Sequence, residues 1–161
     1  MILIAGPCAI EEYETLESVV ETILRDLKDE DFYFKSSCVK DNRTNPNNYG
    51  GVGMELGLEY LLKIRHKYNV NICTDFHNVQ DIEKYGQLVD LIQIPAYLAQ
   101  QTSLMQAVAN SKKRVHVKKP QFLGPIEGLA LIEKMEHLGI SPGRIIMTDR
   151  GTMFGYNQTM V

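Results

Sequence analysis

The sequence predicts an α/β fold of the (β/α)8-barrel class, with about six of the eight β/α units within its 161 residues. Short apolar runs of strand length alternate with segments of helical periodicity. The runs occupy residues 2–5, 32–34, 70–73, 91–92, 115–117 and 145–147. Each run ends in polar or charged residues, which is where a (β/α) barrel carries its functional side chains. A complete barrel usually takes about 250 residues, so we expect residues 1–161 to form a single incomplete barrel domain.

Helical patterns fill the spaces between these runs. Apolar residues at positions 16, 19, 20, 23, 24 and 27 predict the first helix, and leucines at 58, 61 and 62 mark the second. Residues 81–88, 100–110 and 125–138 give three more. Pro125 suits the first turn of the last helix, and Gly139 suits its end. Short connections between such elements imply parallel strands and right-handed crossovers.

Composition restricts the class of protein. The hydrophobic content of 44% and charged content of 23% are ordinary for a globular domain, and the net charge of -3 favours neither nucleic acid nor an anionic membrane as a partner. No apolar stretch approaches the roughly 20 residues of a membrane span, and no secretory signal is visible. An odd count of three cysteines without zinc-ribbon spacing indicates a reducing cytoplasm.

Four cationic residues, Lys35, Lys40, Lys118 and Arg150, follow four different strands. In a barrel they converge on one mouth, where lysine and arginine bind phosphate and carboxylate oxygens. The alternative is that they are ordinary surface residues, which is how we interpret Arg114 and Lys119. Lys40 lies with Asn42 and Arg43 in the one long connection, residues 39–53, and long loops in compact domains are often functional.

Two further strand ends carry candidate side chains. Asp75 and His77 stand at alternate positions and could bind sugar hydroxyls, or could form a structural pair. Cys8 follows Gly-Pro after the first strand, where it is either an inert thiol, a nucleophile or a soft metal ligand. Cys38 and Cys73 fit small core residues.

Taken together, eight motifs resemble the 3-deoxy-D-manno-octulosonate 8-phosphate synthase (2-dehydro-3-deoxyphosphooctonate aldolase) family. In order along the chain they are IAGPCAIE at 4–11, FKSS at 34–37, KDNR at 40–43, TDFH at 74–77, QIPA at 93–96, QT at 101–102, VKKPQFL at 117–123 and TDRGTMFGYN at 148–157. The related 3-deoxy-D-arabino-heptulosonate 7-phosphate synthases have a Lys-Pro-Arg-Thr motif where this chain has KDNR, so the octulosonate family is the closer resemblance.

The resemblance implies condensation of phosphoenolpyruvate with D-arabinose 5-phosphate and release of phosphate, for lipopolysaccharide sugar biosynthesis. It assigns Asn42, Arg43 and Asp75 to the arabinose phosphate, and it places Lys40 beside the reacting carbons as a general acid. The residues that it assigns to phosphoenolpyruvate are Lys35, Ser37, Gln93, Ala96, Lys118 and Arg150.

The resemblance also implies a divalent metal and a homotetramer. Metal-dependent members carry cysteine at the position of Cys8, whereas their remaining His, Glu and Asp ligands correspond to positions beyond Val161. Members usually have arginine where this chain has Gly50 and Gln100, and the second arginine reaches a neighbouring subunit's substrate phosphate. We therefore expect the 161-residue chain alone to be inactive. Three alternatives stay open: a heptulosonate 7-phosphate synthase, a non-catalytic fragment that binds phosphosugars, and another phosphate-binding barrel enzyme.

Overall fold

A computed structural model of the chain describes residues 2–28, 31–153 and 159–160. Contacts divide the chain into two compact units. The first unit comprises residues 1–75 and 88–91, and the second comprises residues 76–87 and 92–161. No helix of the described residues is long and apolar enough to span a bilayer.

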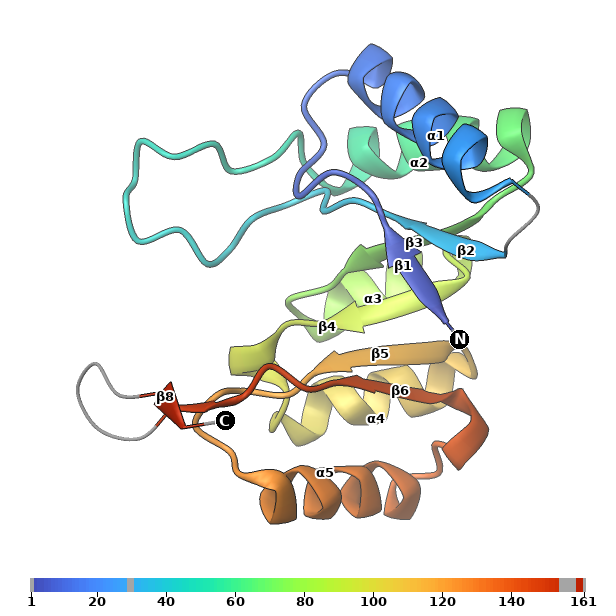
Figure 1. The fold of residues 1–161 in the computed structure, drawn as a ribbon. Coiled ribbons are helices and arrows are strands. Elements are labelled where there is room, and N and C mark those ends of the chain that lie inside the picture. Colours follow the sequence, from blue (N-terminus) through green and yellow to red (C-terminus); the bar gives the residue numbers. More distant parts are fainter. Residues whose placement is uncertain (1, 29–30, 154–158, 161) are drawn as a thin grey trace. The chain divides into compact units, whose positions relative to one another are not determined.

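The first unit begins with three parallel strands connected by helices (Figure 1). In chain order its elements are β1 (Leu3–Ala5), α1 (Tyr13–Leu27), β2 (Phe32–Lys35), α2 (Met54–Tyr68) and β3 (Asn71–Asp75). Leu3 lies opposite Phe32, and Tyr33 lies opposite Asn71. This register brings the carboxyl ends of the strands to one edge of the sheet.

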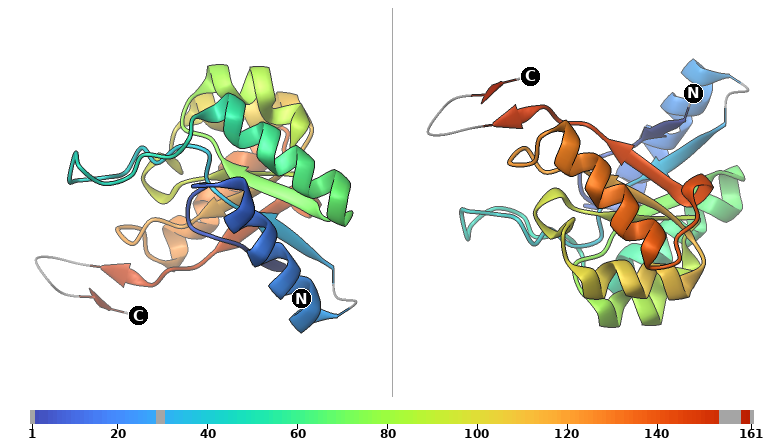
Figure 2. Two further views of the ribbon diagram at one scale, coloured as in Figure 1. Left: turned by 90° about the horizontal axis from the view of Figure 1, so that it is seen from above. Right: turned by 90° about the horizontal axis from the view of Figure 1, so that it is seen from below.

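The helices of the first unit lie side by side and bury one face each (Figures 1 and 2). Leu16 and Val20 of α1 are fully buried, as are Leu61 and Ile64 of α2. Each such aliphatic side chain stabilises the fold by about 1.5–3 kcal/mol. The helical spacing of these residues is the pattern that predicts both helices from sequence.

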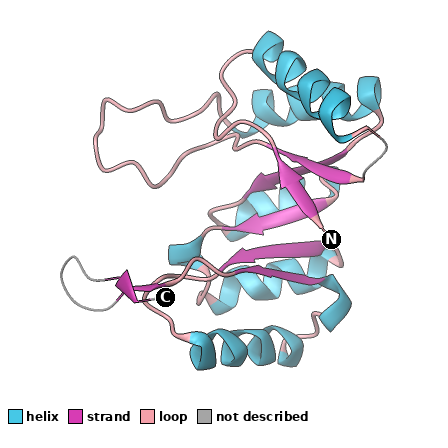
Figure 3. Ribbon diagram, in the orientation of Figure 1, coloured by secondary structure: helices cyan, strands magenta, loops and turns pink. Residues whose placement is uncertain are grey.

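The second unit continues the alternation of strands and helices (Figure 3). Its elements are α3 (Val79–Tyr85), β4 (Leu91–Ile94, of which Leu91 belongs to the first unit), α4 (Thr102–Ser111), β5 (Arg114–Lys118), α5 (Pro125–His137) and β6 (Ile145–Thr148). Three short 3₁₀ helices lie at Gly86–Leu88, Ala96–Leu98 and Pro142–Arg144. The strands follow the order β4-β5-β6.

The predicted class is confirmed, because six strands alternate with helices in the manner of successive (β/α)8-barrel units. All six apolar runs form strands, and the five helical patterns form helices. Pro125 lies in the first turn of α5, and Gly139 takes a positive φ of 93° just beyond the end of that helix. The sequence did not predict the antiparallel pairing of β7 (Thr152–Met153) with β8 (Thr159–Met160).

The packing of α2 against the segment after β2 depends on a glycine. A methyl group at Gly57 would lie 2.7 Å from both Cβ and Sγ of Cys38, which is fully buried. We therefore expect Gly57→Ala to lower the free energy of unfolding in urea by about 1–3 kcal/mol. Gly50→Ala is the control, since nothing lies within 4 Å of a methyl group there. Equal stability of the two variants would contradict this packing.

Candidate active site

Functional side chains cluster at the carboxyl ends of the strands in each unit. In the first unit, Lys35 is the last residue of β2 and Asp75 is the last residue of β3. In the second unit, Lys118 ends β5 and is in register with Thr148, which ends β6. Arg150 lies two residues after β6, so Lys118 and Arg150 belong to the same edge of paired strands.

The first cluster consists of Cys8, Lys35, Ser37, Lys40 and Asp75. The Ser37 hydroxyl oxygen accepts hydrogen bonds from Nζ of Lys35 at 2.6 Å and from Nζ of Lys40 at 2.7 Å. With both lone pairs engaged, the hydroxyl proton remains to be donated. An oxygen atom of a bound phosphate or carboxylate is a suitable acceptor for it.

A buried carboxylate compensates one of these two cations. Lys35 Nζ lies 3.5 Å from Asp75 Oδ1, and the two side chains are 13% and 7% exposed. An ammonium group withdrawn from water needs such a partner, because an unpaired buried charge is strongly destabilising. Asp75 therefore holds Lys35 in place. The sequence had suggested only that Asp75 binds the sugar substrate or pairs with His77.

Lys40 is also close to the exposed thiol of Cys8. The Lys40 ammonium donates a hydrogen bond to this thiol and, with the charges of Lys35 and Arg43, holds its pKa below the ordinary value. The thiolate form is the nucleophile and the metal-binding form of cysteine. Cys38, by contrast, is buried in the core, and this burial raises its pKa to about 11. Cys73 is also buried, so both core assignments are confirmed.

The long connection, residues 39–53, is held at its base and exposed at its tip. Lys40 N donates to Gly50 O at 2.7 Å, and the Tyr49 hydroxyl donates to Ile10 O at 2.9 Å. Figure 2 shows the loop extending away from the helices and strands of the first unit. Asn42 and Arg43 lie in this exposed part, and Arg43 Nε donates to Tyr49 O at 3.4 Å. The anchoring tyrosine carried no sequence signal that we recognised.

In the second unit, two of the predicted site residues lie in β4 and in the turn that follows it. Gln93 is buried, and its carbonyl accepts a hydrogen bond from Phe76 N at 3.0 Å. Ala96 begins the 3₁₀ turn that follows Pro95. His77 lies near the start of this unit and is half-buried, whereas Asp75 belongs to the first unit.

The side chain of Arg150 is exposed, and hydrogen bonds hold its backbone in place. Asp149 Oδ1 accepts hydrogen bonds from the N–H groups of Arg150 and Gly151 at 2.7 and 3.2 Å. The arginine lines a pocket of about 310 Å³ whose other lining residues are Ala96, Tyr97, Pro120, Gln121, Phe122 and Met153. A guanidinium beside such a pocket can bind an oxyanion with two parallel hydrogen bonds.

The interpretation of Lys119 as a solvated surface residue is wrong. Lys119 is 4% exposed, and its ammonium contacts backbone oxygens and the carboxylate of Asp149. Lys119 lies directly after β5, and no sequence signal that we recognised distinguished it from Lys118. Arg114 is half-buried rather than fully solvated. His116 is buried, with Nε2 2.6 Å from Thr148 Oγ1.

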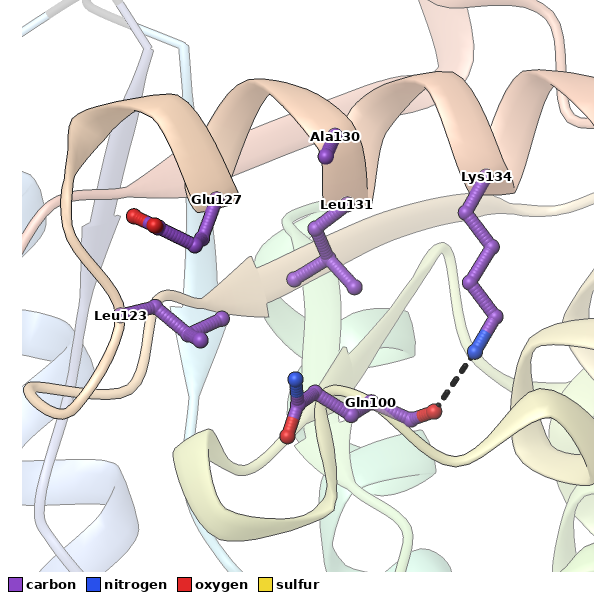
Figure 4. A pocket seen from close by; sticks show the side chains of 6 residues that line it. All are labelled: Gln100, Leu123, Glu127, Ala130, Leu131 and Lys134. Carbon is purple, nitrogen blue, oxygen red and sulfur yellow. Dashed lines mark hydrogen bonds between the residues drawn. The ribbon is translucent and has the colours of Figure 1, made fainter.

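Gln100, at a position where the resemblance implies arginine, borders a smaller pocket of about 240 Å³ (Figure 4). Its backbone oxygen accepts a hydrogen bond from Nζ of Lys134 at 2.8 Å. Leu123, Glu127, Ala130 and Leu131 complete the lining. The contact ties α5 to the segment that precedes α4, and Lys134 supplies the cation nearest to this position within the pocket.

The residues present do not by themselves form a metal centre. Within the described ranges, no group of three or more His, Cys, Asp or Glu side chains could hold a metal ion. A catalytic metal site needs at least three protein donors, and Cys8 offers one. Part of the TDRGTMFGYN motif, residues 154–157, lies outside the described residues.

The Lys40–Cys8 contact predicts a pH-dependent reactivity. Because the ammonium stabilises the thiolate, we expect Lys40→Met to raise the Cys8 pKa and move the pH profile of alkylation by iodoacetamide upward. Cys38 and Cys73 are buried, so early labelling reports on Cys8. Lys63→Met, on the exposed face of α2, is the matched control. An identical profile for parent and Lys40→Met would contradict the contact.

Comparison with known proteins identifies the family of the chain. The model of the DAHP synthetase I family matches residues 1–161. The chain is 39% identical to the 2-dehydro-3-deoxyphosphooctonate aldolase of Wolinella succinogenes, covering 100% of the chain and 65% of that protein. Proteins of the same name from Desulfatibacillum aliphaticivorans and Rickettsia canadensis are 40% and 41% identical, over 100% and 97% of the chain. The chain spans 59% and 57% of their lengths. By the match along its whole length, the chain belongs to the DAHP synthetase I family.

Proposed function

We propose that this chain takes part in the condensation of phosphoenolpyruvate with D-arabinose 5-phosphate to give 3-deoxy-D-manno-octulosonate 8-phosphate and phosphate. The observation that carries the proposal is the Lys35–Ser37–Lys40 arrangement, in which two ammonium groups share one hydroxyl oxygen. Both substrates are multiply charged anions, and such a cluster of donors suits their oxygens. The names of the relatives support the same reaction.

The reaction forms one carbon–carbon bond and expels phosphate. Carbon 3 of the enol ester attacks the sugar aldehyde, water adds its oxygen at carbon 2, and loss of phosphate from carbon 2 leaves a ketone. We propose that Lys40 gives a proton to the alkoxide formed from the aldehyde. The shared hydrogen bonds to Ser37 support this role, because they hold the Lys40 ammonium beside that of Lys35.

The remaining substrate contacts follow the family assignment. Ser37, Gln93, Ala96, Lys118 and Arg150 would bind phosphoenolpyruvate together with Lys35. Asn42, Arg43 and Asp75 would bind the sugar phosphate. His77, which the residue pattern suggested, would bind a sugar hydroxyl. The exposure of Arg43 in the loop and of Arg150 beside its pocket leaves both guanidinium groups accessible to a ligand.

Cys8 is proposed as one ligand of a divalent metal, with the other donors coming from outside the described residues. Its lowered pKa supports this role, because metal binding requires the thiolate. A cytoplasmic location is likewise proposed and is supported by three free cysteines. We also propose a homotetramer, although Gln100 replaces the arginine with which the family reaches a neighbouring subunit.

A heptulosonate 7-phosphate synthase is the second candidate, because the matched family includes that activity in its name. A seven-carbon product requires a four-carbon aldose phosphate in place of arabinose 5-phosphate. Comparing the two aldose phosphates as substrates of a protein containing this chain separates the candidates. The KDNR motif at residues 40–43 favours the five-carbon sugar.

The cationic residues at the strand ends should dominate binding of phosphoenolpyruvate. We expect Lys35→Met and Lys118→Met each to remove a charge-assisted hydrogen bond of about 1.5–3 kcal/mol, which weakens binding about ten- to hundredfold in calorimetry. Lys112→Met is the matched control, since Lys112 is exposed at the end of α4. Unchanged affinity in both test variants would refute the assignment.

Activity of the 161-residue chain alone tests the metal proposal. We expect no release of phosphate from phosphoenolpyruvate and arabinose 5-phosphate, with or without chelator, because Cys8 has too few companion donors among the described residues. The Wolinella relative, assayed in parallel, shows that the assay works. Chelator-sensitive turnover by this chain would show that it assembles a metal site from other residues.

A further inference from the structure

Lys119 is the most deeply buried ammonium group that the described residues contain, and the proposed reaction does not use it. It follows β5 directly, and its side chain lies against α5. A methyl group placed on Gly128 of α5 would come within 3.2 Å of Lys119 Cδ, so the absence of a side chain at Gly128 makes room for the lysine stem. A buried lysine usually needs a specific set of acceptors.

The ammonium group of Lys119 connects two loops. Its Nζ donates to Leu123 O at 2.7 Å, in the loop between β5 and α5, and to Gly151 O at 2.9 Å, in the loop after β6. The Asp149 carboxylate lies 3.2 Å away. Pro120 O is a more distant fourth acceptor at 3.4 Å, so the three nearest acceptors match the three hydrogens of an ammonium group. The lysine thus connects the loops that follow β5 and β6, which are adjacent parallel strands.

Asp149 extends this connection to Arg150. The Lys119 ammonium lowers the pKa of Asp149, and the N–H groups of Arg150 and Gly151 contribute to the same shift. The backbone oxygen of Arg150 accepts a hydrogen bond from Gln121 Nε2 at 3.3 Å. The peptide groups on both sides of Arg150 are therefore fixed, while its guanidinium remains exposed beside the pocket.

We infer that Lys119 is a positioning residue that sets the backbone of Arg150, and through it the direction of the guanidinium, by clamping the β5–α5 loop to the loop after β6. The clamp itself does not depend on the ligand. Only its consequence for phosphoenolpyruvate rests on the proposed function of Arg150. Lysine suits this role because one compact ammonium group can serve several oxygens at once.

Hydrogen exchange tests the clamp without any ligand. Leu123 N donates to Pro120 O, and Met153 N donates to Gln121 O, so these two amides report on the clamped loops. We expect Lys119→Met to accelerate their exchange about tenfold or more relative to amides of α4, whereas Lys112→Met leaves them unchanged. Unchanged exchange at both amides in Lys119→Met would overturn the inference.

A milder variant covers the case in which Lys119→Met does not fold. Asp149→Asn removes the negative charge but keeps an oxygen for the N–H groups of Arg150 and Gly151. The side chain is 74% exposed, so the fold should tolerate the change. We expect faster exchange at Leu123 and Met153 by about two- to fivefold, and no change at either amide would contradict the clamp.

A double-mutant cycle then tests the link to Arg150, with phosphoenolpyruvate as the probe. We expect Lys119→Met to weaken binding about tenfold in the parent chain but less than about twofold in the Arg150→Met background. A merely structural effect would weaken binding equally in both and would overturn the link. If Arg150→Met alone leaves affinity unchanged, the proposed function of Arg150 fails, while the exchange data decide whether the clamp exists.

Discussion

One constraint acts at the strand ends of both units: cationic side chains at the carboxyl ends of parallel strands must find oxygen acceptors within the protein. Partly buried ammonium groups lose hydration, and the cost is tolerable only where hydrogen bonds and counter-charges replace the water. Lys35 and Lys119 meet this requirement in different ways. Lys35 uses a hydroxyl and a buried carboxylate, whereas Lys119 uses backbone carbonyls and an exposed carboxylate.

These two solutions have different consequences. The Ser37 hydroxyl holds Lys35 and Lys40 close together and leaves a proton available, so this part of the site remains able to bind an anion. The ammonium group of Lys119 is occupied by protein oxygens and has become part of the scaffold. Two adjacent lysines of one motif therefore differ in their surroundings: Lys118 is half-buried at the end of β5, whereas Lys119 is buried among loop oxygens.

The two arginines proposed as substrate ligands share a second feature. Both Arg43 and Arg150 are exposed, and hydrogen bonds hold the backbone near each of them. Lys40 N donates to Gly50 O at the base of the loop that carries Arg43. The backbone N–H of Arg150 donates to the Asp149 carboxylate. Fixing the backbone lowers the entropy lost when a flexible side chain binds an anion. Such preorganisation is consistent with the chemistry proposed for a family whose substrates carry several negative charges.

The sequence by itself determined the strand–helix alternation, because short apolar runs of strand length and the 3.6-residue period of helices are both visible in the pattern of apolar residues. It also identified Cys8, Lys35 and Lys40 as candidates, since chemical type and position after a strand are both readable from the order of residues. Tertiary structure alone decided which side chains meet. Lys35 and Lys40 both donate hydrogen bonds to the Ser37 hydroxyl, and these contacts depend on the local backbone geometry. The burial of Lys119 depends on space left by Gly128, nine positions further along the chain, and on carbonyls of two loops, which only folding brings within reach of one ammonium group.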